Sequence, residues 1–552
     1  MPRFVGRCAV ILLSGMMFVP AGAGTKTRIT TRHKAHRARP LKVQIAKLLK
    51  DPAIKRAHWG IAVTKMDGKP VYELNAGQFF QPASNAKLFT TAAALDLLGA
   101  DRTFETKVVG EGIFTGTETL KGTLTLVGSG DANLSGRELP YVPPAERPKP
   151  APPAADPLRY LETMADQVAA TGLKRLDGDV VGDDRLFAQE GYPPDWAIDD
   201  AVWGYGAPVS ALTVNDNQIK VTVTPGTSPA TQPSVTVNPV FSYYTLDTSG
   251  LTTGAAGSGS HVQMVRLPGS KVLQVFGSIA VDSPADMEEV AIADPAEYTA
   301  MAFKGMLEAR GIVVTGIARA GHRPQRYARG MVEWSAEIGA QLGSRFAAGE
   351  GVGECGAVFS GGNIGNRQTV VMASHQSPTL IEDIVLTNKI SENLHAELLL
   401  RHLARRYACD GYAAQGVGAV RAFLTAKVGI DPNDFVFFDG SGLSGHDLVT
   451  PGAIAKLLHY ASTQPWFAGW KASLPVGGED GTLAFRFAKA PLKGRVFAKT
   501  GTLGEARALS GYLEGASGRT VIFSIMVDNH APHSHADEAA MDRIVAAIAA
   551  TN

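Results

Sequence analysis

The sequence predicts an α+β fold in which both ends of the chain form one antiparallel sheet flanked by helices, with β-rich domains inserted between the two ends. Three patterns predict this class. A hairpin pattern lies near the N-terminus, strand patterns and a final helix pattern lie near the C-terminus, and the long stretch between them is dense in short strands and turns. Because exposed loops of a stable scaffold tolerate insertions, one interrupted domain explains all three patterns. A chain of 552 residues is also too long for a single core.

The N-terminal segment 1–23 has the pattern of a secretory signal peptide. Arg3 and Arg7 provide a basic start, residues 8–19 form an apolar run, and residues 21–23 read Ala-Gly-Ala, as at a cleavage site. The apolar run is too short to cross a membrane as a helix. We therefore expect a protein that is exported to the periplasm or the extracellular space.

A basic segment follows at 24–42, and we interpret it as a linker. Residues 1–42 hold nine Lys or Arg and no acidic residue, and seven of the nine lie between Lys26 and Lys42. Two interpretations stay open: residues 26–42 contact the cell wall or a membrane surface electrostatically, or they form a solvated arm. Nothing else in the chain indicates a nucleic-acid partner, and we expect none.

The first part of the interrupted domain is predicted at 43–106. A hairpin that turns at Asp67-Gly68 precedes a helix that begins near Ser84. One apolar face of this helix is marked by residues at helical spacing, Leu88, Ala92, Leu95 and Leu98. Ser84 and Lys87 are three residues apart and therefore share a face. Two interpretations stay open: Ser84 starts an ordinary helix with Lys87 as an early surface charge, or the two residues form a reactive pair.

The inserted region is predicted at 107–369, where short strand patterns alternate with Gly, Asp and Pro turns. Two segments in it have no assigned role. The segment 140–157 contains eight prolines and reads as a stiff extended excursion, and the segment 328–366 is rich in glycine. The second part of the interrupted domain, 370–552, reads as helices followed by three strands and a helix from about residue 535.

The cysteines give no sign of a metal centre. Cys8 lies in the predicted signal peptide, so Cys355 and Cys409 remain. Export permits a disulfide between them, but Cys355 lies in the glycine-rich segment and Cys409 at a predicted helix end, so their pairing stays open. Neither has the sequence context of a nucleophile or a ligand, and we expect no metal and no cofactor.

Three short motifs occur in order along the chain: Ser84-x-x-Lys87, Ser391-Glu392-Asn393 and Lys499-Thr500-Gly501. Each motif alone is a weak signal. All three in order, at a predicted helix start, a loop beside a helix and a strand, are the signature of penicillin-binding proteins and class A β-lactamases. Ser391 lies 307 residues after Ser84, which is far too many for a compact β-lactamase and fits inserted domains.

The motif residues supply the groups that acyl transfer needs. The hydroxyl of Ser84 needs a base to attack an amide, and Lys87 can serve if burial or a nearby cation such as Lys499 lowers its pKa. Ser391 can relay a proton to the departing amine. Asn393 can hold the substrate amide and orient Lys87, and Lys499 can face a substrate carboxylate.

The third motif also has the residue types that bind an extended substrate. Thr500 and Thr502 add hydroxyl donors, and Gly501 lets the substrate backbone lie close against the strand. The backbone N–H groups of Ser84 and Thr502 would form the oxyanion hole.

In these motifs the chain resembles the D-alanyl-D-alanine carboxypeptidase/endopeptidase family of low-molecular-mass penicillin-binding proteins, of the class C or penicillin-binding protein 4 type. Further segments that resemble the family cover most of the mature chain, in the order QPASNAKLFTTAAALDLLG, GAPVSALTVNDN, ASHQSPTLIEDIVLTNKISENLHAELLLR, FDGSGLSGHDLVTP and FAKTGTL. The resemblance implies a β-lactamase/transpeptidase-like domain interrupted by inserted domains. It also implies a serine-type hydrolase of peptidoglycan stem peptides that works through an acyl-serine and binds β-lactam antibiotics covalently. Residues 439–446 would form a structural turn near its site.

The resemblance further implies a pocket for the free amine of a stem peptide, to which we assign Asp200 and Tyr205. The alternative is an exposed loop acid and a packed tyrosine. Two other functions stay open. One is a β-lactamase, which would turn over penicillin instead of being trapped by it, and the other is a non-catalytic envelope scaffold, against which the intact motifs argue. Carboxypeptidase and endopeptidase activity are not distinguished.

Overall fold

The computed structural model describes residues 40–350, 355, 366–515 and 517–552. The predicted signal peptide and nearly all of the predicted basic linker lie outside these residues, as does part of the glycine-rich segment. In the described part of the chain, no helix has both the length and the apolarity to cross a membrane.

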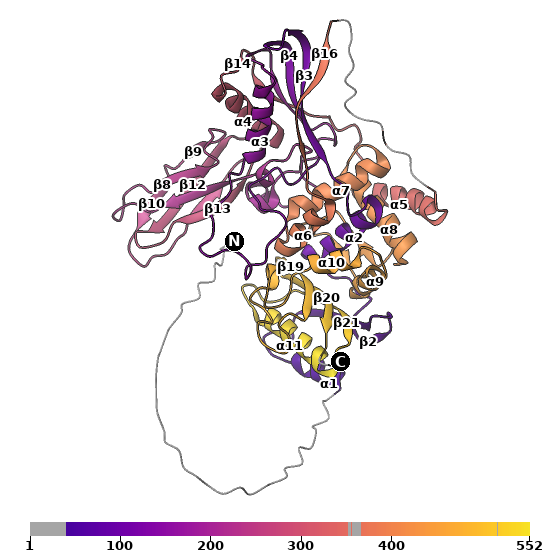
Figure 1. Cartoon of the computed structure of the whole chain (residues 1–552). Coiled ribbons are helices and arrows are strands. Elements are labelled where there is room, and N and C mark those ends of the chain that lie inside the picture. The colour runs from indigo at the N-terminus through magenta and orange to yellow at the C-terminus, as the bar shows by residue number, and fades with distance from the viewer. Residues whose placement is uncertain (1–39, 351–354, 356–365, 516) are drawn as a thin grey trace, which may run out of the picture. The chain divides into compact units, whose positions relative to one another are not determined.

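One five-stranded antiparallel sheet contains strands from both ends of the chain (Figure 1). Its strands, in the spatial order β19-β20-β21-β1-β2, are Val496–Leu503, Ala506–Glu514, Thr520–Asp528, His58–Lys65 and Pro70–Leu74. The early and late parts of the chain join where β1 pairs with β21, with Ile61 opposite Ile525. The predicted α+β class and the sheet built from both chain ends are thus confirmed.

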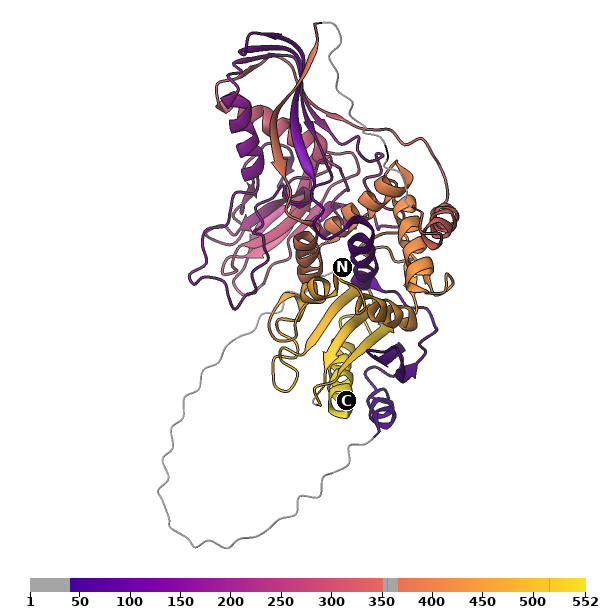
Figure 2. The same ribbon diagram turned by 45° about the vertical axis from the view of Figure 1, so that its right-hand side comes forward.

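Helices cover both faces of this sheet (Figure 2). α1 (Leu41–Leu48) and α11 (Ala536–Thr551) share a core with one face, and α2 (Ala86–Leu98) and α9 (Pro451–Ala461) share a core with the other. Because side chains alternate along a strand, β21 contributes to both cores. Its run 521–527 is therefore apolar on both faces, with a single serine as the exception.

Further helices complete the layer around α2: α6 (Leu380–Ile390), α7 (Asn393–Ala408), α8 (Ala413–Phe423) and α10 (Phe467–Ser473). Two short strands, β17 (Phe435–Val436) and β18 (Leu448–Val449), pair beside them. This helical layer and the sheet edge at β19 enclose the residues of all three motifs.

The region between α2 and α6 has a core and sheets of its own. Its strands are β3 Glu105–Thr115, β4 Thr119–Val127, β5 Arg175–Asp177, β6 Val180–Asp183, β7 Gln218–Thr224, β8 Ser234–Asn238, β9 Thr245–Asp247, β10 Leu251–Gly254, β11 Gln263–Val265, β12 Val272–Ala280, β13 Asp286–Ala291, β14 Val313–Val314, β15 Ala318–Gly321 and β16 Gln368–Gln376. The largest sheet follows the path β14-β5-β4-β3-β16, and smaller sheets are built on β7 and β12. Helices α3 (Arg159–Ala170) and α4 (Pro295–Ala309) pack into the same core. The domain boundaries stay predictions.

Helix α5 (Met331–Ala347) lies in the segment that the sequence marks only as glycine-rich. Glycines let α5 approach α8 closely. A Cβ atom on Gly339 would lie 2.9 Å from the Arg421 side chain, and one on Gly418 would lie 2.6 Å from the Ile338 side chain. Glycine at these positions therefore serves helix packing, whereas in sequence it reads as a loop signal.

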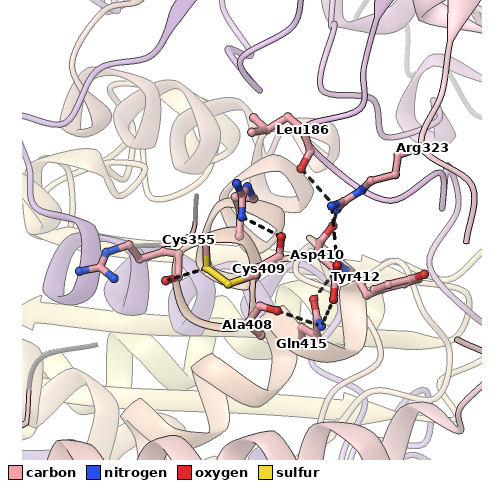
Figure 3. Close-up of a disulfide and its surroundings, with 10 residues drawn as sticks. Leu186, Arg323, Cys355, Ala408, Cys409, Asp410, Tyr412 and Gln415 are labelled. Carbon is pink, nitrogen blue, oxygen red and sulfur yellow. Dashed lines mark hydrogen bonds and ion pairs between the residues drawn. A yellow bond between two sulfur atoms is a disulfide. The ribbon is translucent and has the colours of Figure 1, made fainter. Parts of the chain in front are cut away.

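Cys355 and Cys409 form a disulfide, with their Cα atoms 5.3 Å apart (Figure 3). Cys409 follows the end of α7 with a left-handed backbone, at φ 73°. In the same turn, the Gln415 side chain donates a hydrogen bond to the carbonyl of Ala408 at 3.2 Å. The pairing that the sequence leaves open is thus present, and it ties the chain beyond α5 to the end of α7.

Candidate active site

Ser84 lies in a turn of 3₁₀ helix, Ala83–Asn85, that leads directly into α2. α2 is buried from Ala86 to Leu95, so the side chain of Lys87 in its first turn points into the protein. The Lys87 Nζ atom lies 2.9 Å from the Ser84 Oγ atom. The two residues therefore meet on one face as predicted, and the alternative of a surface charge is excluded because Lys87 is fully buried.

Two further oxygen atoms hold the Lys87 amine in place. Its Nζ atom donates to Oδ1 of Asn393 at 2.6 Å and to the backbone carbonyl of Ser441 at 2.8 Å. Burial lowers the pKa of Lys87 to about 8, while nearby carboxylates, first among them Asp439, oppose the shift. An amine with that pKa is partly neutral near neutral pH, so it can accept the hydroxyl proton of Ser84.

The second motif forms the junction between α6 and α7, a loop beside a helix as predicted. Ser391 ends α6 with a left-handed backbone, at φ 66°, and Glu392 precedes the first residue of α7, Asn393. The Ser391 Oγ atom accepts a hydrogen bond from the Nζ atom of Lys499 at 2.8 Å. The second and third motifs therefore meet at this serine.

Lys499 is fully buried on β19, at the edge of the sheet. Its Nζ atom also donates to the carbonyl of Thr500 at 2.9 Å, and the Thr500 hydroxyl lies 2.7 Å from that of Thr482. Burial, and secondarily the charge of Lys87, lowers the pKa of Lys499 well below its ordinary value. A carboxylate placed against Lys499 would raise that pKa again, so the positive charge predicted here depends on the substrate.

β19 runs so close to the Ser84 turn that only glycine fits at position 501. A Cβ atom on Gly501 would lie 2.6 Å from the carbonyl oxygen of Pro82 and 3.2 Å from the backbone nitrogen of Ser84. The next residue, Thr502, is exposed. The third motif thus borders the serine, while the oxyanion hole assigned to the N–H groups of Ser84 and Thr502 stays a prediction.

Asp200 and Tyr205 lie in consecutive turns of 3₁₀ helix, Asp200–Val202 and Gly204–Gly206. The Tyr205 hydroxyl donates to Asp200 Oδ1 at 2.8 Å, and the Tyr205 carbonyl accepts from Asn393 Nδ2 at 2.9 Å. Burial raises the pKa of Asp200. The fold therefore brings this pair beside the motif residues, and the binding of an amine by Asp200 stays a prediction.

The motifs do not identify Asp439, yet its carboxylate shapes one wall of the site. It accepts hydrogen bonds of 2.7 to 2.9 Å from the backbone N–H groups of residues 442–444, and one of 2.9 Å from the indole of Trp196. These bonds fix a turn that aims the carbonyl of Ser441 at Lys87. The Asp-Gly-Ser-Gly stretch is a turn signal in sequence, but only the family resemblance indicates its place.

Two more carboxyl groups are buried behind this turn. Glu397 Oε1 accepts from the backbone N–H of Gly440 at 2.9 Å, and burial raises the pKa of Glu397 to about 8. Asp447 Oδ1 accepts from the backbone N–H of Phe438 at 2.7 Å, and burial raises the pKa of Asp447 well above its ordinary value. Both groups therefore hold a proton more readily than exposed carboxyls do, which limits the negative charge around Lys87.

A buried ion-pair network joins the inserted region to the second motif. Arg137 contacts Asp216 at 2.5 Å and Glu392 at 3.0 Å. Asp216 also lies 3.2 Å from one ring nitrogen of His395, and Asp383 lies 2.7 Å from the other. Burial lowers the pKa of His395, but the two aspartates outweigh burial and raise it to about 10. Residues of the inserted region therefore hold in place the turn that carries the second motif.

The chain is similar to known proteins over most of its length. A model of the D-Ala-D-Ala carboxypeptidase 3 (S13) family matches residues 41–343 and 313–548. A D-alanyl-D-alanine carboxypeptidase of Actinomadura sp. (strain R39) is 32% identical over 504 residues, which cover 89% of this chain and 81% of that protein. D-alanyl-D-alanine carboxypeptidase DacB of Haemophilus influenzae is 25% identical over 467 residues, 83% of each chain. The crystal structure of penicillin binding protein 4 from Haemophilus influenzae has the same fold, with a TM-score of 0.71 at 21% identity over 91% of this chain and 97% of that one.

Proposed function

The chain belongs to the D-Ala-D-Ala carboxypeptidase 3 (S13) family, and from this premise we propose that it is a serine-type D-Ala-D-Ala carboxypeptidase or DD-endopeptidase acting on peptidoglycan stem peptides. The family match confirms the resemblance that the motifs indicate. The observation that carries the proposed mechanism is the 2.9 Å contact between the Ser84 hydroxyl and the buried Lys87 amine. Covalent binding of penicillin to Ser84 belongs to the same proposal.

In the proposed reaction, neutral Lys87 takes the hydroxyl proton of Ser84 while Oγ attacks the carbonyl carbon of the penultimate D-alanine. The backbone N–H groups of Ser84 and Thr502 hold the oxyanion. The C–N bond then breaks, the proton that Lys87 took passes through Ser391 to the leaving amine, and the acyl group stays on Ser84 while Lys87 is neutral again. In the second half, water attacks the ester, Lys87 takes the water proton, and the proton returns to Ser84.

The contacts of Asn393 support the proposed recognition. Its side chain binds Lys87 through one atom and the carbonyl of Tyr205 through the other, so the base and the predicted amine pocket share one positioning residue. The substrate groups are divided among the site residues as follows: the carboxylate goes to Lys499, Thr500 and Thr502, the amide to Asn393, and the free amine to Asp200 and Tyr205.

A β-lactamase is the alternative within the same chemistry, and a non-catalytic scaffold is the alternative outside it. A scaffold has no physical need for two fully buried lysines, because burying an amine costs free energy unless it is used or neutralised. We also propose, from the sequence of residues 1–42, that the protein is exported to the periplasm or extracellular space and that residues 26–42 contact the envelope electrostatically.

Incubation with purified muropeptides, followed by mass analysis of the products, tests the function. We expect pentapeptides to lose one D-alanine or cross-linked dimers to split into monomers, with penicillin suppressing both reactions. Rapid turnover of penicillin would favour the β-lactamase. Penicillin labelling without any change in the muropeptides would contradict the proposed substrate.

A further inference from the structure

The proline-rich loop (residues 140–157) has no part in the function proposed above, yet it is attached beside the candidate site. Its ends lie together. Arg159 Nη2 donates to the carbonyl of Arg137 at 2.7 Å, and a Cβ atom on Gly136 would lie 2.8 Å from the carbonyl oxygen of Ala155. The loop is therefore a closed excursion from the inserted region with a fixed base.

Two contacts fix this loop next to two of the three motifs. At its base, Arg137 pairs with the glutamate of the second motif at 3.0 Å. Near its start, the Tyr141 hydroxyl accepts a hydrogen bond from the backbone N–H of Gly481 at 3.2 Å. Gly481 adjoins Thr482, whose hydroxyl lies 2.7 Å from that of Thr500 in the third motif.

The second and third motifs meet on the side of the site where the leaving group departs in the proposed reaction. Lys499 of the third motif contacts Ser391 of the second at 2.8 Å, and Ser391 is the residue assigned to relay a proton to the leaving amine. A loop attached to both motifs therefore borders the leaving group more closely than the acyl group.

The loop carries an exposed cation, Arg147, beside the tyrosine that contacts Gly481. The guanidinium of Arg147 lies 5.8 Å from the centre of the Tyr141 ring, and its Nε atom donates to the carbonyl of Val142 at 3.0 Å. These contacts orient the side chain before any ligand arrives. The eight prolines restrict the backbone, so little conformational entropy is lost on binding. A planar guanidinium held in this way suits a carboxylate.

We propose that the proline-rich loop is a leaving-group subsite for carboxylate-bearing peptides, and that Arg147 binds the carboxylate. When a single D-alanine leaves, its one carboxylate is taken by the third motif, and the loop has nothing to bind. When a cross-link is cut, the leaving group is an acidic peptide that extends past the third motif toward the loop. The inference rests on the proposed function and assigns to the loop a preference for cross-linked over terminal substrates.

The test compares kcat/KM of the full chain for a cross-linked muropeptide dimer and for a pentapeptide monomer. Arg147→Gln should lower the dimer-to-monomer ratio about 2- to 5-fold, the effect of one partly exposed charged contact, and the loss should shrink at high salt. Lys121→Gln removes an exposed cation from β4 and is the matched control, with an unchanged ratio. An unchanged ratio in Arg147→Gln overturns the proposal, and so does a rise, which would mark the loop as a steric barrier.

A second readout separates the subsite from the reaction. Binding of the dimer and the monomer to Ser84→Ala protein is measured by calorimetry, with and without Arg147→Gln. The added substitution should weaken dimer binding more than monomer binding, and equal weakening overturns the proposal. If the wild-type protein cuts neither substrate, the proposed function fails, while the binding comparison still decides the role of the loop.

Discussion

Lys87 and Lys499 are both fully buried in the candidate site, but their surroundings differ in charge. After burial, the influences on Lys87 come from carboxylates, and its pKa falls only to about 8. After burial, the influence on Lys499 comes from Lys87, and its pKa falls well below the ordinary value. The two amines thus occupy similar depths and have opposite electrostatic partners.

This difference fits the roles proposed for the two residues, with Lys87 as the base and Lys499 as the group that binds the substrate carboxylate. With a pKa of about 8, Lys87 can exchange a proton near neutral pH, because nearby carboxylates offset part of the shift that burial causes. For Lys499 the charge of Lys87 adds to the effect of burial, so a substrate carboxylate placed beside Lys499 would restore its charge. The favourable pairing is then available only with a substrate that ends in a carboxylate, which is how binding energy selects for reaction.

The largest expected effect tests the assignment of the base. Ser84→Ala and Lys87→Met should each lower the rate of labelling by a fluorescent penicillin by at least about 10³-fold, since one removes the nucleophile and the other the group that takes its proton. Gel fluorescence measures the labelling, and thermal unfolding checks that each variant is folded. Fast labelling of Lys87→Met would contradict the assignment of Lys87 as the base.

A smaller effect is expected for Lys499, which is proposed to bind the substrate carboxylate. Lys499→Ala should reduce kcat/KM about 10- to 150-fold for a peptide that ends in a free carboxylate, the effect of losing one buried charged contact. The same peptide as a methyl ester should lose much less. Steady-state kinetics on the matched pair give the comparison. Equal losses on acid and ester would assign Lys499 to general electrostatics.

Asp200 extends the comparison of the two lysines, because we expect it to bind the positively charged amine of the substrate, whereas Lys499 is expected to bind the negatively charged carboxylate. Asp200→Asn should lower kcat/KM about 5- to 50-fold for a stem peptide with a free amine and leave the acylation rate of a simple thioester nearly unchanged. The exposed neighbour Asp199 provides the matched control, Asp199→Asn. If both substrates slow alike, Asp200 supports structure instead.

The smallest expected effect is a shift in pH dependence. Acylation needs neutral Lys87, so its rate should rise with pH through a midpoint near 8. Glu397, whose own pKa burial raises to about 8, is partly ionised near this midpoint, and its carboxylate then stabilises the charged form of Lys87 and raises the pKa of Lys87. Glu397→Gln should therefore move the midpoint to lower pH, by less than about one pH unit. A pH profile of penicillin acylation measures this midpoint. A midpoint that moves to higher pH would contradict the inference that nearby carboxylates raise the pKa of Lys87.

The chemistry-bearing groups can be predicted from sequence because their spacing is local. Ser84 and Lys87 share a helical turn, and Lys499 begins a short strand motif, so each pattern is complete within a few residues. The α+β class follows for a similar reason, since strand and helix patterns at the two chain ends are local too. How closely the motifs approach one another does not follow from any of these patterns.

Contacts between distant parts of the chain could not be predicted. Lys87 and the carbonyl of Ser441 are 354 positions apart, and Arg137 and Glu392 are 255 apart. Neither pair has a sequence signal, because each residue reads locally as a turn carbonyl or a surface charge. The helix around Gly339 is missed because glycine that allows two helices to touch looks the same in sequence as glycine that ends one.

β1 lies between β2 and β21 in the sheet, although β1 is synthesised early and β21 near the end of translation. Until residue 520 has been made, one edge of β1 has no partner, and open apolar edges recruit other chains. The pairing that closes this edge spans most of the protein and is therefore slow to form. A growing or truncated chain that stops before β19 thus carries Ser84 and Lys87 without Lys499, and the open edge of β1 makes such a chain prone to aggregate.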